Sequence, residues 1–148
     1  MKEKDLSEVD DIGRKYEVFK NIETLVFDMN LTVDVAVVEG PHDMKTLRLM
    51  GYRRPIITCS KLSPVRIVDQ IAKRYVSVVV LTDFDSEGET MGERLENLLK
   101  SRGTRVDRSS RRHFRILLRK VGLETIEDIY RLKMELFHSN RSHPKCMS

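Results

Sequence analysis

Cysteine is scarce in this chain: two of its 148 residues are cysteines, Cys59 in an apolar stretch and Cys146 near the end. Two cysteines so placed form neither a disulfide framework nor a zinc motif, and they suit a reducing compartment. Long apolar runs are also missing, since none approaches the ~20 residues of a membrane-spanning helix, and the first residues are charged rather than like a signal peptide. We therefore expect a soluble, cytoplasmic protein with no membrane partner.

Acidic residues are nearly absent from residues 102–120, here called the basic segment. It holds seven arginines and one lysine against a single acid, Asp107, whereas the whole chain has a net charge of only +4. The rest of the chain is therefore net acidic. A basic segment beside an acidic site suits a polyanion that arginine holds by its phosphates.

The length and composition predict one domain. With 40% hydrophobic residues over 148 positions, the chain can build one core but is too short for two ordinary domains. We expect a disordered or frayed N-terminus at 1–13, a single domain at 14–138 and a flexible tail at 139–148. Within the domain, a core at 33–107 precedes a helical extension at 110–137.

The spacing of apolar residues predicts short strands that alternate with helices. Strands are expected at 33–39, 55–59, 76–81 and 104–107, and helices at 14–29, 42–50, 64–74, 88–101, 110–121 and 125–137. This order predicts an α/β fold: a Rossmann-like open doubly wound sheet of about four mainly parallel strands, with an N-terminal helix and two C-terminal helices. Ligands bind such sheets beyond the carboxyl ends of the strands, where strand order reverses. If the first and third strands are neighbours, Glu39 and Asp83 meet there.

Four carboxylates crowd into the seven residues after the third predicted strand, here called the acidic segment (83–89). Asp83, Asp85 and Glu87 stand at alternate positions and would repel one another unless a cation lay among them, which predicts a divalent metal site. Magnesium, with manganese as a substitute, suits oxygen ligands, whereas zinc would want histidine or cysteine. The alternative is an acidic helix N-terminus favoured by the helix dipole, a role that fits Glu89.

Glu39 is the candidate general acid or base. It follows the apolar run 35–38, and such surroundings disfavour the charged form of a carboxyl group. The alternative is an ordinary exposed glutamate at a strand end. The acidic segment expected beside it favours the catalytic interpretation.

Two stretches resemble the two signatures of the Toprim domain: Val38-Glu39-Gly40-Pro41-His42-Asp43 and the acidic segment Asp83-Phe84-Asp85-Ser86-Glu87-Gly88-Glu89. This family includes parts of type IA topoisomerases, bacterial-type primases and the ribonuclease that matures 5S ribosomal RNA. The resemblance covers about residues 33–107. It implies that Glu39 is a general acid or base and that Asp83, Asp85 and Glu87 bind magnesium. The chain lacks the additional domains of topoisomerases and primases, so it is most similar to stand-alone small Toprim proteins.

Arginines recur at steps of four on the predicted helix 110–121. Arg111, Arg115 and Arg119 share one face, with Arg112 beside them and apolar residues opposite. The planar guanidinium can donate two hydrogen bonds to one phosphate, so these four are candidate nucleic-acid-binding residues. The alternative is an ordinary solvated helix face. No exposed aromatic residues are interleaved with these arginines, so base stacking is not predicted. The tyrosines lie in elements better explained by packing, so none is a candidate nucleophile.

Three hypotheses follow for the function. The first is a magnesium-dependent enzyme that cleaves or transfers phosphodiesters in RNA or DNA, with Glu39 moving a proton. The second is a non-catalytic, metal-dependent module that binds nucleic acid or nucleotides for a partner. The third is a small-nucleotide sensor or hydrolase, for which the arginine face would be dispensable.

Overall fold

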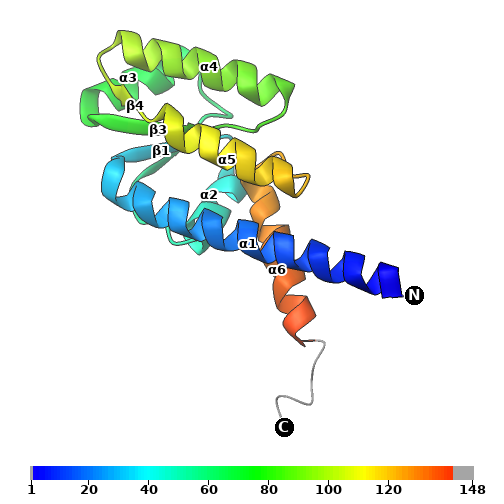
Figure 1. Ribbon diagram of the computed structural model, residues 1–148. Helices are drawn as coiled ribbons and strands as arrows, with labels where there is room; N and C mark the ends of the chain where they lie inside the picture. The colour runs from blue at the N-terminus through cyan, green and yellow to red at the C-terminus, as the bar shows by residue number, and fades with distance from the viewer. Residues whose placement is uncertain (1, 142–148) are drawn as a thin grey trace.

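The computed structural model describes residues 2–141, and along them six helices alternate with four strands (Figure 1). The strands are β1 (Val35–Val38), β2 (Ile56–Thr58), β3 (Ser77–Leu81) and β4 (Arg105–Val106). The helices are α1 (Lys2–Thr32), α2 (Pro41–Leu49), α3 (Pro64–Arg74), α4 (Ser86–Ser101), α5 (Arg108–Lys120) and α6 (Glu127–Arg141).

All four strands are parallel, in the order β2-β1-β3-β4. The chain adds β2 on one side of β1 and then returns to add β3 on the other side, so strand order reverses between β1 and β3. In their register Val38 lies beside Leu81. The two strands therefore end together, and Glu39 and Thr82 are the first residues beyond the sheet at the point where ligands bind open α/β folds.

Helices cover both faces of the sheet. Every residue of β1 and β3 is buried, and their side chains alternate between two cores, as expected for strands covered on both faces. One core contains Val38 and Leu81 and is closed by α1, α2, α5 and α6, whereas the other contains Val37 and Val80 and is closed by α3 and α4. Figure 1 shows α4 and α5 on opposite sides of the sheet. The predicted doubly wound fold, with an N-terminal helix and two C-terminal helices, is confirmed.

The helix boundaries differ from those expected at both ends of the chain. Helix α1 begins at Lys2, within the segment 1–13 that we expected to be frayed. No proline interrupts this stretch, and Lys15 pairs with Glu135 of α6 at 2.9 Å, so a tertiary contact holds the helix and its N-terminal turns propagate from it. Helix α6 continues to Arg141, and the remainder of the predicted tail, 142–148, lies outside the described residues.

Helix α4 also begins earlier than expected, at Ser86 rather than at Gly88. Half of the acidic segment is therefore helical, which changes the roles of its members. None of the helices in the part of the chain that the structure describes is long and apolar enough to cross a membrane.

Candidate metal and nucleic-acid site

Glu39 and Asp83 meet at the carboxyl ends of β1 and β3. The backbone amide of Asp83 donates to Oε1 of Glu39 across 3.3 Å, which holds the glutamate against the start of the acidic segment. Burial, together with the neighbouring charge of Glu39, raises the pKa of Asp83 to about 7, and Asp43 and Asp85 contribute in the same direction. The structure thus brings together the two strand-end acids that the sequence suggested.

Asp85 caps helix α4. Its Oδ1 accepts a hydrogen bond from the amide of Gly88 at 2.8 Å, which satisfies one of the unpaired donors in the first turn. Glu87 lies in that first turn and is exposed. The helix-start alternative therefore describes part of what Asp85 and Glu87 do, and the metal role predicted for both stays a prediction.

Gly88 allows the acidic segment to fold tightly over the end of β3. A Cβ at this position would lie 2.0 Å from the carbonyl oxygen of Asp83, far inside any real contact. The Thr82 hydroxyl donates to the carbonyl of Gly88 at 2.8 Å. The absence of a side chain at Gly88 thus fixes the distance between Asp83 and the start of α4.

The donor set suits a hard divalent cation. Its members offer carboxylate oxygens, and burial followed by the charge of Glu39 raises the pKa of Asp83. Within residues 2–141, no three histidine, cysteine, aspartate or glutamate side chains are already grouped closely enough to hold an ion. Magnesium keeps several waters and often binds through one or two carboxylates, so the carboxylates of the acidic segment fit magnesium, whereas zinc would want histidine or cysteine.

Asp43 is a buried carboxylate at the turn between β1 and α2. It is buried, with only 6% of its surface exposed. Its Oδ2 accepts the amide of Gly40 at 3.1 Å, and its Oδ1 accepts the amide of Glu127 at 2.9 Å. One carboxylate therefore fixes the turn that carries Glu39 and also holds the N-terminus of α6. Asp43 is the third residue of α2, a position where capping acids are common.

The side chain of Cys59 is buried next to the same acids. Burial first, and then Glu39, Asp83 and Asp43, raise the pKa of its thiol to about 11. Because only the thiolate is a good nucleophile or metal ligand, this cysteine is unreactive at neutral pH. It packs beneath the acidic site without taking part in its chemistry.

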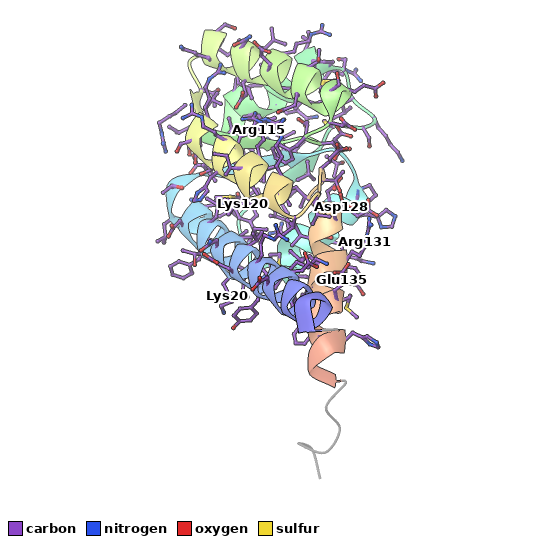
Figure 2. The ribbon with its side chains drawn as sticks, turned by 45° about the vertical axis from the view of Figure 1, so that its right-hand side comes forward. Lys20, Arg115, Lys120, Asp128, Arg131 and Glu135 are labelled. Carbon is purple, nitrogen blue, oxygen red and sulfur yellow. The ribbon has the colours of Figure 1, made fainter. Side chains whose placement is uncertain are left out.

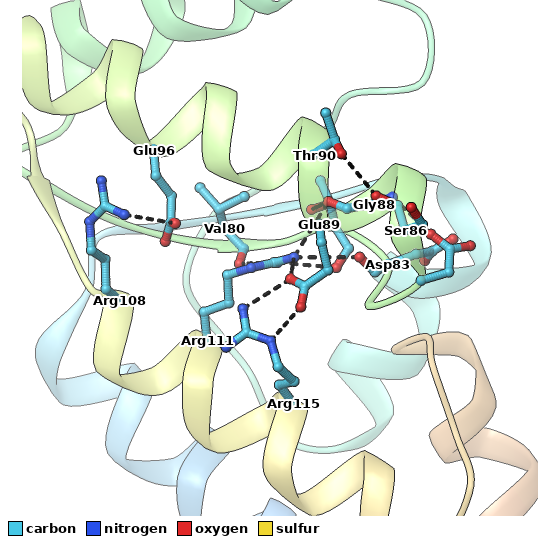
Figure 3. Close-up of polar contacts among 12 residues, drawn as sticks. Val80, Asp83, Ser86, Gly88, Glu89, Thr90, Glu96, Arg108, Arg111 and Arg115 are labelled. Carbon is cyan, nitrogen blue, oxygen red and sulfur yellow. Dashed lines mark hydrogen bonds and ion pairs between the residues drawn. The ribbon is translucent and has the colours of Figure 1, made fainter.

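Arg111 points into the protein and not outward to a ligand. Only 2% of it is exposed. Its Nη1 donates to the carbonyls of Val80 and Thr82 at 2.8 and 3.1 Å, and its Nη2 to Oε1 of Glu89 at 2.7 Å (Figure 3). Its guanidinium also lies 4.6 Å above the ring of Phe84. The prediction that Arg111 offers its charge to a nucleic acid is therefore corrected, because this guanidinium is fully used in the fold.

Glu89 forms ion pairs with several arginines of helix α5. Besides Arg111, it accepts hydrogen bonds from Nε and Nη2 of Arg115, the latter at 2.9 Å (Figure 3). Nη2 of Arg119 lies 3.8 Å from Oε2 of Glu89. Burial alone would raise the pKa of Glu89, but the hydrogen bonds from Arg115 and Arg111 outweigh it and lower that pKa. Glu89 is thus more than an acidic residue at a helix start.

Helix α4 supplies the acids that the basic segment itself lacks. A cavity of about 250 Å³ lies between α4 and α5, and it is lined by Glu89, Glu93, Glu96, Arg108, Arg111 and Arg115. Glu96 is buried there, which raises its pKa, and its ion pair with Arg108 is 3.4 Å long. Counting charge within 102–120 missed these partners because they come from another helix. On α5, Arg112 and Arg119 are exposed to solvent, and Figure 2 shows Arg115 and Lys120 along the same helix.

The parallel sheet with acids at its reversal point defines a Toprim domain. The family model of the Toprim domain matches residues 34–114, which include β1 to β4, the acidic segment and the first half of α5. The chain belongs to the Toprim domain family, as a small member of the UPF0292 type. Toprim domains generally bind Mg²⁺ and are associated with nucleic acid.

Its relatives are of similar length. A UPF0292 protein of Pyrococcus abyssi is 34% identical over 120 residues, which cover 81% of this chain and 89% of that protein. A UPF0292 protein of Thermococcus onnurineus is 33% identical over 127 residues, 86% of this chain and 94% of that one. Among solved structures, a protein from Aquifex aeolicus superposes with a TM-score of 0.58 at 27% identity, covering 76% of this chain and 95% of its own.

Proposed function

We propose that the protein is a magnesium-dependent enzyme that cleaves or transfers phosphodiester bonds in RNA or DNA, with Glu39 as its general acid or base. The observation that carries this proposal is the contact of Glu39 with Asp83 at the reversal point of the sheet. A site that only bound metal would not need Glu39 so close, whereas proton transfer to or from a reacting oxygen does.

Each acid has a distinct role in this proposal. Asp83, Asp85 and Glu87 would hold Mg²⁺, with Mn²⁺ as a substitute. When bound, such an ion neutralises charge on the scissile phosphate. Glu39, fixed by the amide of Asp83, takes a proton from the attacking oxygen or gives one to the leaving oxygen. Asp43 keeps the Glu39 turn in place through the amide of Gly40.

Two exposed arginines of α5, Arg112 and Arg119, would contact the phosphate backbone, with half-buried Arg115 beside them. Such contacts read charge and shape rather than base sequence. A nucleic-acid substrate fits a cytoplasmic location, which stays a prediction.

The second candidate is a non-catalytic module that binds nucleic acid or nucleotides and positions them for a partner protein. One observation favours it: among residues 2–141 no three potential ligands are gathered as a finished metal site. In this case metal would bind only together with phosphate, and Glu39 would serve as one more ligand.

Cleavage assays with matched variants separate the candidates. Structured RNA, single-stranded DNA and duplex DNA are incubated with the protein and either Mg²⁺ or a chelator. We expect Mg²⁺-dependent cleavage that falls by about 10²-fold or more in Glu39→Gln, as for loss of a general acid or base, and that is also lost in Asp83→Asn. Glu17→Gln, an exposed change on α1, should cleave like the wild type. Nucleic-acid binding without cleavage by any form would overturn the enzyme and leave the binding module.

A further inference from the structure

A cleft opens between α2 and α6 beside the acidic site. It has a volume of about 520 Å³ and is lined by His42, Lys45, Thr46, Leu49, Glu127 and Tyr130, which is within the ~300–1,000 Å³ typical of ligand pockets. A second hollow of about 360 Å³ adjoins it, because Glu127 and Tyr130 line both. Helix α6 lies outside the part of the chain that matches the Toprim model, so the cleft combines the family domain with this chain's own extension.

Tyr130 has an unusual position for a tyrosine that the sequence suggested was packed. Almost half of it, 48%, is exposed, and it forms a wall of both hollows. A flat, half-exposed ring between two hollows can receive an unpaired base on its face, since base stacking on an aromatic side chain requires only an accessible ring. Lys45 brings positive charge to the same cleft, and His42 brings ring nitrogens that can form hydrogen bonds.

Hydrogen bonds fix the position of the cleft relative to the acidic site. His42 is three residues beyond Glu39. The carboxylate of Asp43 accepts hydrogen bonds from the amide of Gly40 at 3.1 Å and from the amide of Glu127 at 2.9 Å. A single side chain therefore links the turn that carries Glu39 to the first residue of α6. Tyr130 follows Glu127 by one helical turn. If a nucleic-acid strand places one phosphate at Glu39 and Asp83, its adjacent nucleotide would therefore lie at this cleft.

We propose that the cleft binds one unpaired nucleotide of the nucleic acid whose neighbouring phosphate lies at the acidic site. The base stacks on Tyr130, and the phosphate of this nucleotide contacts Lys45 and His42. Glu127 offers an acceptor to the amino group of a base, as carboxylates do for cytosine. The inference rests on the proposed function, and it narrows the substrate to nucleic acid that is single-stranded next to the reacting phosphate.

A protein partner is the competing occupant, because Met134 and Phe137 continue an exposed apolar stripe along α6. Nucleic acid is the favoured occupant of the cleft itself, since Lys45 and His42 line the cleft and the acids of the candidate metal site adjoin it. Figure 2 shows that α6 also carries charges, among them Asp128, Arg131 and Glu135. Such charges are depleted at the centres of protein interfaces.

Binding measurements on tyrosine variants test the inference. Fluorescence anisotropy gives dissociation constants for fluorescein-labelled single-stranded and blunt duplex oligonucleotides, both with Mg²⁺, in the Glu39→Gln background to prevent cleavage. We expect Tyr130→Ala to weaken single-strand binding about tenfold and duplex binding little, as for loss of one stacked base, and Tyr130→Phe to bind like its parent. Tyr16→Ala, which removes a tyrosine that is 55% exposed on α1, is the matched control. Lys45→Ala should lower the salt dependence of log Kd by about one.

The outcomes separate this inference from the proposed function. If the parent protein binds single strands and Tyr130→Ala binds them equally well, the cleft is not the nucleotide site, while the proposed function stands. Equal losses for single strands and duplex also overturn it. If Tyr130→Ala instead abolishes self-association in sedimentation and leaves nucleic-acid binding unchanged, the cleft is a protein interface. If the parent protein binds no nucleic acid, the proposed function itself fails.

Discussion

Two carboxylates of the acidic segment, Asp83 and Glu89, are six residues apart and have opposite surroundings. Asp83 faces the acids Glu39, Asp43 and Asp85, and its pKa is raised to about 7. Glu89 faces Arg111 and Arg115, and its pKa is lowered. One end of the segment has its charge balanced by the protein, whereas the other end has like charges gathered at the reversal point of the sheet.

The difference separates structure from function within a single motif. Balanced charges around Glu89 hold α4, α5 and the end of β3 together. The unbalanced acids around Asp83 contribute little to the stability of the fold, because like charges that are partly buried destabilise the folded state. Such an arrangement is typical of a site that receives a cation with its ligand. Three changes test the comparison, from the largest expected effect on stability to the smallest.

Replacing Arg111 should lower the free energy of unfolding the most. Arg111→Ala removes the partner of Glu89 and leaves the carbonyls of Val80 and Thr82 without a donor. Breaking a buried ion pair on one side costs about 3–5 kcal/mol of unfolding free energy, measured from urea unfolding curves. Arg112→Ala, next in the chain but exposed, should change it by no more than ~0.5 kcal/mol. Similar losses in both variants would contradict the buried role of Arg111.

Adding a methyl group at Gly88 should have an intermediate effect. The new Cβ would meet the carbonyl of Asp83 at 2.0 Å, so the backbone must move, at a cost of about 1–3 kcal/mol for overpacking. Displacing Asp83 from Glu39 should also weaken the binding of Mn²⁺, which electron paramagnetic resonance can titrate. Gly13→Ala is the control, because nothing lies within 4 Å of a Cβ there. It should stabilise α1 by about 0.5–1 kcal/mol, and a stable Gly88→Ala would refute the close contact.

Removing the charge of Asp83 should have the smallest effect on stability, and it should depend on pH. The pKa of this carboxyl is about 7 in the folded protein and about 3.9 when unfolded. The folded state therefore holds a proton that the unfolded state releases, and stability is lost as pH rises from about 4 through 7. In chelator, Asp83→Asn should be more stable than the wild type at pH 7.5, by about 1 kcal/mol after discounting for solvent screening, and the gap should shrink at pH 5.

Thermal unfolding with and without Mg²⁺ completes this prediction. Added Mg²⁺ should raise the Tm of the wild type at pH 7.5, because a ligand that binds only the folded state stabilises it. It should leave Asp83→Asn nearly unchanged. An equal response of the two proteins to Mg²⁺ would show that the metal binds elsewhere.

Glu39 and Asp83 could be predicted from the sequence, and the reason is local. Each follows a short apolar run, and parallel neighbouring strands bring their carboxyl ends together. The remaining assumption was that β1 and β3 are neighbours, which the strand order confirms. Right-handed crossovers and short connections leave few other arrangements.

The orientation of Arg111 could not be predicted in the same way. Its spacing from Arg115 placed both on one helix face but did not say what that face meets. The answer depends on α4, which crosses close to the guanidinium because Gly92 has no side chain: a Cβ there would lie 2.8 Å from Nη2 of Arg111. Tyr130 was misjudged for a related reason, since the periodicity of α6 does not show which of its positions α2 leaves uncovered.

The short strand β4 gives Arg111 a further consequence. β4 pairs only with Ser77 and Val78 of β3, so beyond these residues the edge of β3 has carbonyls that no strand meets. An open edge of this kind is a template on which another chain can add a strand and begin to aggregate. Arg111 occupies the carbonyls of Val80 and Thr82, and a guanidinium has no acceptor with which to extend a β-ladder. We therefore expect the same arginine that stabilises the fold to keep another chain from adding a strand at this edge of the sheet.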